Sequence, residues 1–124
     1  MAVKKTILQN LIGEMKRGTL VLAVLLITRD PAYGYSLVGD LQAAGIDVEQ
    51  NTLYPLLRRL ESQGLMSSFW DTSESRPRKY YQVTQEGVET AELLTGEWET
   101  QHAVMDQLIL AAKAKSEESK NENN

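Results

Sequence analysis

The chain contains no cysteine. This absence excludes a disulfide framework and a thiolate zinc site, and it is typical of a reducing compartment. Long hydrophobic runs are also missing: the longest, residues 20–27, has eight residues, whereas a membrane-spanning helix needs about twenty. A signal peptide would place its apolar stretch earlier and follow it with small residues. We therefore expect a cytoplasmic protein that makes no membrane contact.

The side chains that catalysis most often requires are scarce. His102 is the only histidine, and the sequence has no paired carboxylates, no glycine-rich phosphate loop and no metal-ligand spacing. We interpret His102 as an interface or surface residue. The sequence predicts no enzyme, and we expect no cofactor and no metal.

What is present suits a small folded domain with some length left for an arm or tail: 124 residues, of which 42% are hydrophobic. The net charge of −4 argues against a nucleic-acid partner if it is taken alone. The charge is unevenly distributed, however. Residues 1–81 carry ten Lys/Arg and eight Asp/Glu, whereas residues 82–124 carry three and nine. Any contact with nucleic acid must therefore come from a local basic patch in the first region.

Hydrophobic periodicity predicts three helices in the first half of the chain. The first covers residues 4–15, and residues 20–27 continue as a helix that is apolar on all sides, typical of the centre of a small domain. Pro31 ends this stretch. A second helix is predicted over residues 35–44 and a third from about residues 49–52 onward. Gly45 and Gly64 are interpreted as their left-handed stops.

The second half of the chain begins with two predicted strands, residues 65–70 and 78–83, joined by a polar loop. Thr84 is a plausible N-cap for a helix that no proline interrupts until about residue 115. Residues 116–124 contain no apolar side chain and are expected to form a disordered polar tail. The predicted domains are residues 1–84, 85–115 and 116–124.

This order of elements predicts a mainly α fold with a small β-hairpin, namely a winged helix-turn-helix followed by a long C-terminal dimerisation helix. A helix of roughly thirty residues outreaches a domain of this size, so we expect its apolar face to need a second subunit. The expected dimer interface consists of Val88, Ala91, Leu94, Trp98, Met105, Leu108 and Ile109.

Polar side chains on the predicted third helix and cations in the hairpin indicate a contact with duplex DNA. The candidate DNA-binding residues are Tyr35, Ser36, Gln50, Asn51, Thr52, Tyr54, Arg58, Arg59, Arg76, Arg78 and Lys79. Other readings stay open for several of them. Asn51 and Thr52 are equally suited to cap the helix, Tyr54 to a half-buried structural role, and one of the two helix arginines to pairing with Glu61 or Asp47. The hairpin cations could simply keep an edge soluble.

The sequence also resembles the PadR family of transcriptional regulators. The resemblance rests on Tyr33-Gly34-Tyr35, on Thr52-Leu53-Tyr54-Pro55-Leu56-Leu57-Arg58-Arg59-Leu60-Glu61 with Gly64-Leu65, and on Pro77-Arg78-Lys79-Tyr80-Tyr81 with Thr84 and Gly87. It implies the short subgroup with a single C-terminal helix, whose members are dimeric repressors. In some multidrug-responsive members a tryptophan of that helix stacks flat aromatic compounds. Trp98 falls at that place, and with Met105 it is the candidate ligand-binding pair; an interface anchor is the alternative for Trp98.

The leading hypothesis is therefore a homodimeric, sequence-specific repressor of transcription. It would bind double-stranded DNA at a palindromic operator, and a small aromatic or drug-like inducer bound near the dimer interface would release it. The alternative is a winged-helix protein–protein interaction module without DNA binding, for which an acidic chain would be natural. The basic third helix and hairpin favour the first hypothesis.

Overall fold

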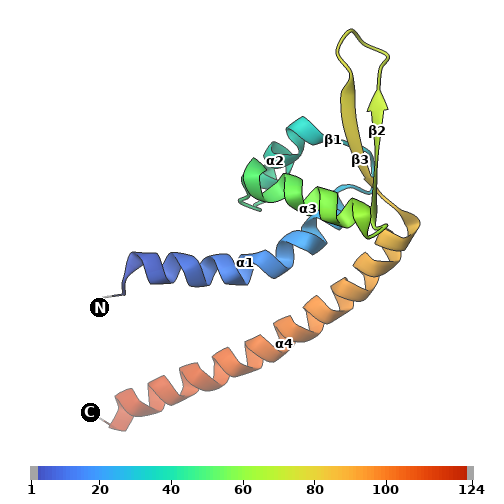
Figure 1. The fold of residues 1–124 in the computed structure, drawn as a ribbon. Helices are drawn as coiled ribbons and strands as arrows, with labels where there is room; N and C mark the ends of the chain where they lie inside the picture. Colours follow the sequence, from blue (N-terminus) through green and yellow to red (C-terminus); the bar gives the residue numbers. More distant parts are fainter. Residues whose placement is uncertain (1–2, 123–124) are drawn as a thin grey trace. The chain divides into compact units, whose positions relative to one another are not determined.

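The computed structural model describes residues 3–122. Its elements are α1 (Lys5–Ile27), β1 (Ala32–Tyr33), α2 (Gly34–Ala43), α3 (Gln50–Ser62), β2 (Met66–Asp71), β3 (Arg78–Val83) and α4 (Gln85–Glu122), as Figure 1 shows. The chain divides after Ala91 into two compact units, and each is described by itself. The observed architecture confirms the predicted class: mostly helices, a small antiparallel sheet and a C-terminal helix.

The core of the first unit is built on α3. The side chains of Leu53, Leu57 and Leu60 on this helix are at most 1% exposed. Their spacing of three and four residues puts them on one face of the helix, which packs inward. The rest of the core consists of Leu20, Val24, Leu25, Leu37, Leu41, Val48, Leu56, Met66, Tyr81, Val83 and Ala91. The buried part of α1 is thus its C-terminal half, where the sequence is apolar on all sides.

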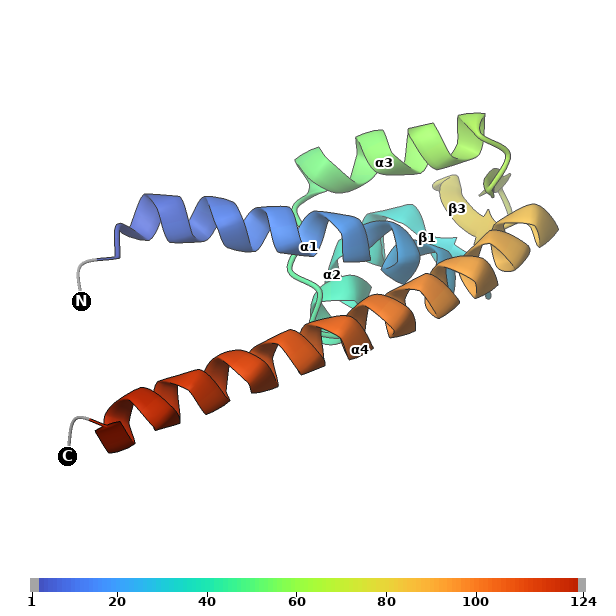
Figure 2. The same cartoon turned by 90° about the horizontal axis from the view of Figure 1, so that it is seen from below.

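Helix α1 is one continuous helix, so the segments expected at 4–15 and 20–27 join. Its N-terminal half runs clear of α2 and α3 (Figure 2). The apolar side chains there are exposed: Val3, Ile7, Leu8, Leu11, Ile12 and Met15. Among the described residues of the first unit, 3–91, none covers this apolar stripe.

The sheet has three strands in the order β1-β3-β2, all antiparallel. The expected two-stranded hairpin is correct for β2 and β3, but β1 pairs with the other edge of β3 through Ala32↔Tyr81 and Tyr33↔Tyr80. At the foot of the hairpin, the N–H of Val83 donates to the carbonyl of Thr28 at 3.0 Å. The loop of the hairpin stands beyond the helices (Figure 1). The hairpin is thus a wing fixed at its base and free at its tip.

Two of the expected helix stops and one expected cap are confirmed. Gly45 and Gly64 have φ values of 97° and 79°, a left-handed conformation that glycine adopts without a steric penalty. The Thr84 hydroxyl accepts the N–H of Gly87 at 3.0 Å and donates to the Gly64 carbonyl at 2.7 Å. Thr84 therefore caps α4 and ties its start to the end of α3.

Helix α4 continues to Glu122, so the expectation of a disordered tail from residue 116 is wrong for residues 116–122. Glu and Lys dominate this stretch, and both propagate a helix well once it has begun. Residues 123 and 124 of the expected tail lie outside the described residues. The first turns of α4 belong to the winged unit, which ends at Ala91 and not at residue 84.

The second unit is the remainder of α4, from Glu92 onward. Its apolar side chains are exposed: Leu93, Trp98, Val104, Met105, Leu108, Ile109 and Leu110. One local cluster stands on this surface. The rings of Trp98 and His102 stack with centroids 5.0 Å apart, and Nδ1 of His102 lies 3.3 Å from a carboxylate oxygen of Asp106. Within residues 3–122, no helix is both long and apolar enough to cross a membrane.

Candidate nucleic-acid interface

The two faces of α3 differ completely. Its leucines form the core, and the opposite face presents Arg58 and Arg59, both exposed. The first turn carries the exposed Gln50, Asn51 and Thr52. Helix α3 begins after Glu49, and the side chain of this N-cap residue makes no capping hydrogen bond. Asn51 and Thr52 lie inside the helix, so the alternative that either is its N-cap is wrong.

The sequence-predicted residues on the other elements are also accessible. At the start of α2, Tyr35 is 72% exposed, and the exposed Ser36 donates its hydroxyl hydrogen to the carbonyl of Tyr33 at 3.1 Å. In the wing, Arg76 and Arg78 are exposed and Lys79 is half-buried. Tyr54 is half-buried, as its structural alternative requires, and its hydroxyl lies 3.5 Å from the Gly34 carbonyl.

A shallow recess of about 280 Å³ brings candidates from three elements together. It is lined by Tyr35 of α2, Tyr54 of α3 and Lys79 of the wing, together with Tyr33, Gly34, Trp70, Pro77 and Tyr81. The ammonium of Lys79 lies 5.9 Å from the ring centroid of Trp70 and 5.3 Å from that of Tyr81. A cation held between aromatic faces keeps its charge at a defined place. No acidic side chain lines this recess.

Gly34 makes this arrangement possible. A Cβ atom at this position would lie 2.9 Å from Cε2 of the Tyr81 ring and 3.5 Å from the Lys79 carbonyl oxygen. Tyr81 is buried, so its ring cannot easily move away. The Tyr33-Gly34-Tyr35 motif therefore lets α2 begin directly against β3, and the rings of its two tyrosines lie 6.0 Å apart.

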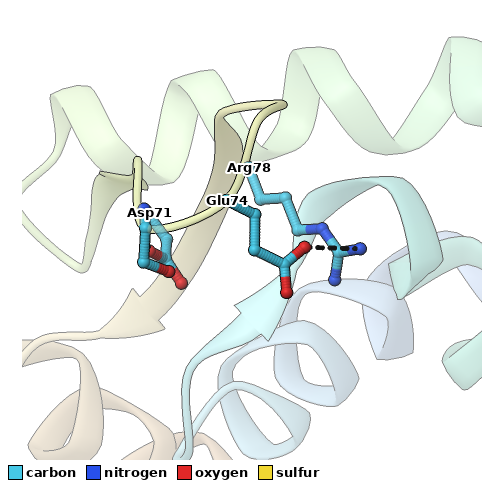
Figure 3. Close-up of polar contacts among 4 residues, drawn as sticks. Asp71, Glu74 and Arg78 are labelled. Atoms are coloured by element: carbon cyan, nitrogen blue, oxygen red, sulfur yellow. Dashed lines mark hydrogen bonds and ion pairs between the residues drawn. The ribbon is translucent and has the colours of Figure 1, made fainter.

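The outer face of the sheet carries the wing arginine. Cζ of Arg78 lies 5.3 Å from the ring centroid of Tyr33, and Nη2 lies 3.4 Å from a carboxylate oxygen of Glu74 (Figure 3). A hydrogen bond with Tyr80, and next the charge of Glu74, raise the pKa of Arg78. The Tyr80 ring in turn packs against Tyr33 and against Phe69. The guanidinium therefore has a fixed place at the base of the wing loop.

Asp71 faces Arg78 across the hairpin but binds its own loop. The Asp71 and Arg78 positions are paired in the β2–β3 register, and the Ser73 N–H donates to Oδ1 of Asp71 at 3.0 Å. Hydrogen bonds from the side chain and then the backbone of Ser73 lower the pKa of the Asp71 carboxyl. Its charge is thus stabilised locally.

Several residues that lie at this interface were not among the DNA-binding candidates predicted from the sequence. Tyr33, Trp70 and Tyr81 surround Lys79 and Arg78, and Glu74 pairs with Arg78. Alternation along the two strands was the available signal, since residues two apart on a strand share a face. It places Trp70, Lys79 and Tyr81 on one face once the register of the hairpin is known. The register itself depends on how the six-residue polar loop, residues 72–77, closes.

A second recess, of about 380 Å³, lies beside the start of α3. Lys16 and Arg17 of α1 line it together with Asp47, Glu49 and Thr52. The cations and carboxylates are balanced here, so the recess has no single charge preference.

The expected pairing of a helix arginine with Glu61 or Asp47 is not found. In the described part of the chain neither Arg58 nor Arg59 makes an ion pair, and Glu61 instead accepts a hydrogen bond from the Ser68 hydroxyl at 2.5 Å. Both guanidinium groups are therefore available to a partner.

On α4, the structure separates the expected interface residues into two groups. Ala91 is 5% exposed and buried in its own winged unit, so the expectation that it faces a partner subunit is wrong. Val88 and Leu94 are half-buried. Trp98, Met105, Leu108 and Ile109 are 45–58% exposed and remain available.

The described residues hold no cluster of three or more His, Asp, Glu or Cys side chains that could bind a metal ion. The interface is instead a surface of cations, amides and tyrosines on a helix and a wing. Those groups suit phosphate oxygens and base edges. The fold and this surface together define a winged-helix, DNA-binding regulator of transcription.

Comparison with known proteins identifies the family. The model of the Transcriptional regulator PadR-like family matches residues 21–93, more than half of the chain. The chain belongs to this family, and the resemblance seen in the sequence is confirmed.

Solved structures and a curated relative agree. A PadR family transcriptional regulator from Eggerthella lenta is 47% identical, with 84% of this chain and 93% of that chain covered and a TM-score of 0.78. A PadR-like transcription factor from Bacteroides fragilis is 31% identical, with 80% and 98% covered and a TM-score of 0.65. A transcriptional regulator of Mycobacterium tuberculosis is 35% identical over 75 residues, 60% of this chain and 70% of that protein. All three are named as regulators of transcription or transcription factors.

Proposed function

We propose that the protein is a sequence-specific transcriptional repressor that binds a palindromic DNA site as a homodimer. In this proposal the exposed face of α3 enters the major groove. Base edges are contacted by Gln50, Asn51 and Thr52, and phosphates by Arg58 and Arg59. The wing residues Arg76, Arg78 and Lys79 contact the neighbouring DNA backbone. Tyr35 and Tyr54 from the recess, and Ser36 at the start of α2, contact it as well.

The observation that carries the proposal is the two-sided character of α3. Four leucines of one face are buried, which fixes the helix in the core, while the arginines of the other face are exposed and make no ion pair within residues 3–122. A helix that only stabilises a domain does not need unpaired guanidinium groups. A helix that enters a charged groove does.

The homodimer is proposed to form through the exposed apolar side chains of α4. A row of exposed apolar residues at heptad spacing is unusual for a monomer, because each would remain in water. Two subunits joined in this way would place two copies of α3 in successive major grooves, about 34–36 Å apart on DNA.

DNA binding is tested by fluorescence anisotropy with the DNA upstream of the protein's own gene, in the presence of competitor DNA. We expect Arg58→Ala to weaken binding and to reduce the slope of log affinity against log salt by about one, because one phosphate contact is lost. Binding of the parent protein should also fall steeply with salt. Arg29→Ala is the matched control, because Arg29 is exposed at the foot of the hairpin and its contact with Gln82 uses only the backbone carbonyl. Equal affinities of the parent and Arg58→Ala would reject the assignment.

Release by a planar aromatic inducer is proposed to involve Trp98 and Met105. Trp98 is 46% exposed and its ring already stacks on His102, so one face of the cluster accepts a flat ring. Titration with a planar aromatic dye such as proflavine should quench tryptophan fluorescence in the parent protein and not in Trp98→Ala, in which Trp70 supplies the background signal. Quenching of the same size in both proteins would exclude this site.

A further inference from the structure

The wing contains an ion pair between Arg78 and the carboxylate of Glu74. Nη2 of Arg78 and Oε2 of Glu74 are 3.4 Å apart, and their side chains remain 46% and 67% exposed (Figure 3). The acceptor of a guanidinium group in a protein–DNA complex is also an anionic oxygen. Glu74 therefore satisfies the group that the proposed function assigns to the DNA backbone.

Arg78 is prepared for such an acceptor before any DNA arrives. Its guanidinium lies over the ring of Tyr33 and interacts with Tyr80, and these two rings are 5.8 Å apart. Two elements thus hold it apart from Glu74: β3 through Tyr80 and β1 through Tyr33. A side chain held in this way loses little rotamer freedom when it binds a phosphate. The remaining obstacle to a phosphate is Glu74.

The other carboxylate of the wing does not compete in the same way. Asp71 accepts the Ser73 N–H, and no ion pair between Asp71 and Arg78 is found in the described residues. Residues 71–79 contain Asp71 and Glu74 against Arg76, Arg78 and Lys79. Neutralising Glu74 alone would double the net positive charge of this segment from one to two.

We propose that Glu74 is an intramolecular competitor of DNA: it pairs with Arg78 in the free protein and must be displaced by a phosphate when the wing docks. The inference rests on the proposed DNA-binding function. Because the pair is exposed, its attraction is weak and a phosphate can displace it. Glu74 thus lowers the affinity of the wing for DNA without abolishing it. Phosphate contacts carry no sequence information, so competition by Glu74 reduces binding to all duplexes equally.

The test is Glu74→Gln in the full chain, measured by anisotropy with the upstream duplex and with a duplex of scrambled sequence. We expect about 3- to 10-fold tighter binding to both duplexes at 0.1 M salt, and a slope of log affinity against log salt that is steeper by up to about one. Glu89→Gln is the matched control: it removes the same charge from an exposed residue of the winged unit and should change affinity less than twofold. Unchanged affinity in Glu74→Gln would overturn the proposal.

A double-mutant cycle separates the ion pair from general repulsion of DNA. In the Arg78→Ala background, Glu74→Gln should give less than half of its effect on log affinity, because the partner is gone. A gain as large as in the parent background would show that Glu74 acts only as a nearby negative charge, and it would overturn the proposal. Thermal melting of each variant verifies that it folds.

The same experiment distinguishes this inference from the proposed function. Binding of the parent to the upstream duplex, and its loss in Arg58→Ala, tests the function of the chain. The ratio of the DNA affinities of Glu74→Gln and the parent tests the competition by Glu74. A parent protein that binds no duplex would refute both the proposed function and the competition by Glu74. A parent that binds DNA, with a Glu74→Gln variant of the same affinity, would refute only the competition by Glu74.

Discussion

The two units of the chain use apolar side chains in opposite ways. In the winged unit the leucines of α3 are buried in their own subunit. The outer face of α3 and the wing present cations, amides and aromatic side chains, whereas the N-terminal half of α1 leaves its apolar side chains exposed. In the second unit the apolar side chains of α4 are exposed, and the charged residues are mainly acidic: residues 92–124 carry seven Asp/Glu and three Lys, against ten of each sign in residues 1–91. The core around α3 is thus filled by side chains of the first unit. The second presents a surface whose burial requires something else.

The largest expected effect comes from making the same substitution in both units, which tests whether their leucines are buried differently. Leu57→Ala removes a side chain that is 0% exposed and should lower the free energy of unfolding by about 2–5 kcal/mol. Leu108→Ala removes one that is 58% exposed, and its effect should depend on protein concentration. Urea unfolding at two protein concentrations measures both. A concentration-independent loss of the same size for Leu108→Ala would show that α4 is packed within one subunit.

A charge on the apolar face of α4 should have the next largest effect. Leu108→Glu would bury a carboxylate in the proposed dimer contact, and we expect subunit association at least about 100-fold weaker, which corresponds to about 2.7 kcal/mol. Sedimentation velocity measures the change. Gln107→Glu is the control, because Gln107 is two residues from Met105 and lies on the opposite side of the helix. A Leu108→Glu variant that remains dimeric at all concentrations would exclude this face as the interface.

Within the winged unit, two glycines of α2 give a smaller and sharper contrast. Gly34→Ala places a methyl group against the buried Tyr81 ring and should destabilise the unit by about 1–3 kcal/mol. Gly39→Ala meets no atom within 4 Å and should stabilise it by about 0.5–1 kcal/mol. Thermal unfolding of both variants tests the close approach of α2 to β3. Similar melting temperatures would contradict it.

The smallest expected effect is local to the wing. The pKa of Asp71 is lowered by the Ser73 side chain and then by its backbone N–H, so any stability this carboxylate contributes is present above the pKa of the unfolded chain and is lost as the pH falls through the folded pKa. NMR titration of the Asp71 carboxyl should give a midpoint below its ordinary value. Ser73→Ala should raise this midpoint and Ser75→Ala should not. An unchanged midpoint in Ser73→Ala would remove the side-chain hydrogen bond as the cause.

The sequence predicted α3 well, because its two faces separate cleanly: four leucines at helical spacing bounded by Gly64. The wing strands and the Thr84 cap were also predicted, since β-branched and aromatic runs and a capping hydroxyl are local signals. Strand β1 was missed. Ala32 and Tyr33 are too few to show alternation, and they form a strand only because β3 offers them an open edge.

The limits of α4 were harder to predict than its existence. Residues 116–122 contain no apolar side chain, which suggested disorder, yet α4 continues through them to Glu122. Ala91 shows the opposite error. Its heptad position indicated a partner contact, but the first turns of α4 pack in the winged unit, where Gly87 lies so close to the Leu65 carbonyl that no Cβ would fit. Periodicity identifies an apolar face but does not say which molecule covers it.

Local pattern and motifs in the sequence were enough to give the helices, the two wing strands and their order, the family, and the list of cations on α3 and the wing. The contacts between these side chains depend on the tertiary structure. It placed Tyr33 and Glu74 on Arg78, Trp70 and Tyr81 on Lys79, and left Arg58 and Arg59 without an acidic partner in the described chain. The reason is that strand register and the closing of the wing loop are set by packing across the whole unit, whereas helical spacing is set by neighbours along the chain.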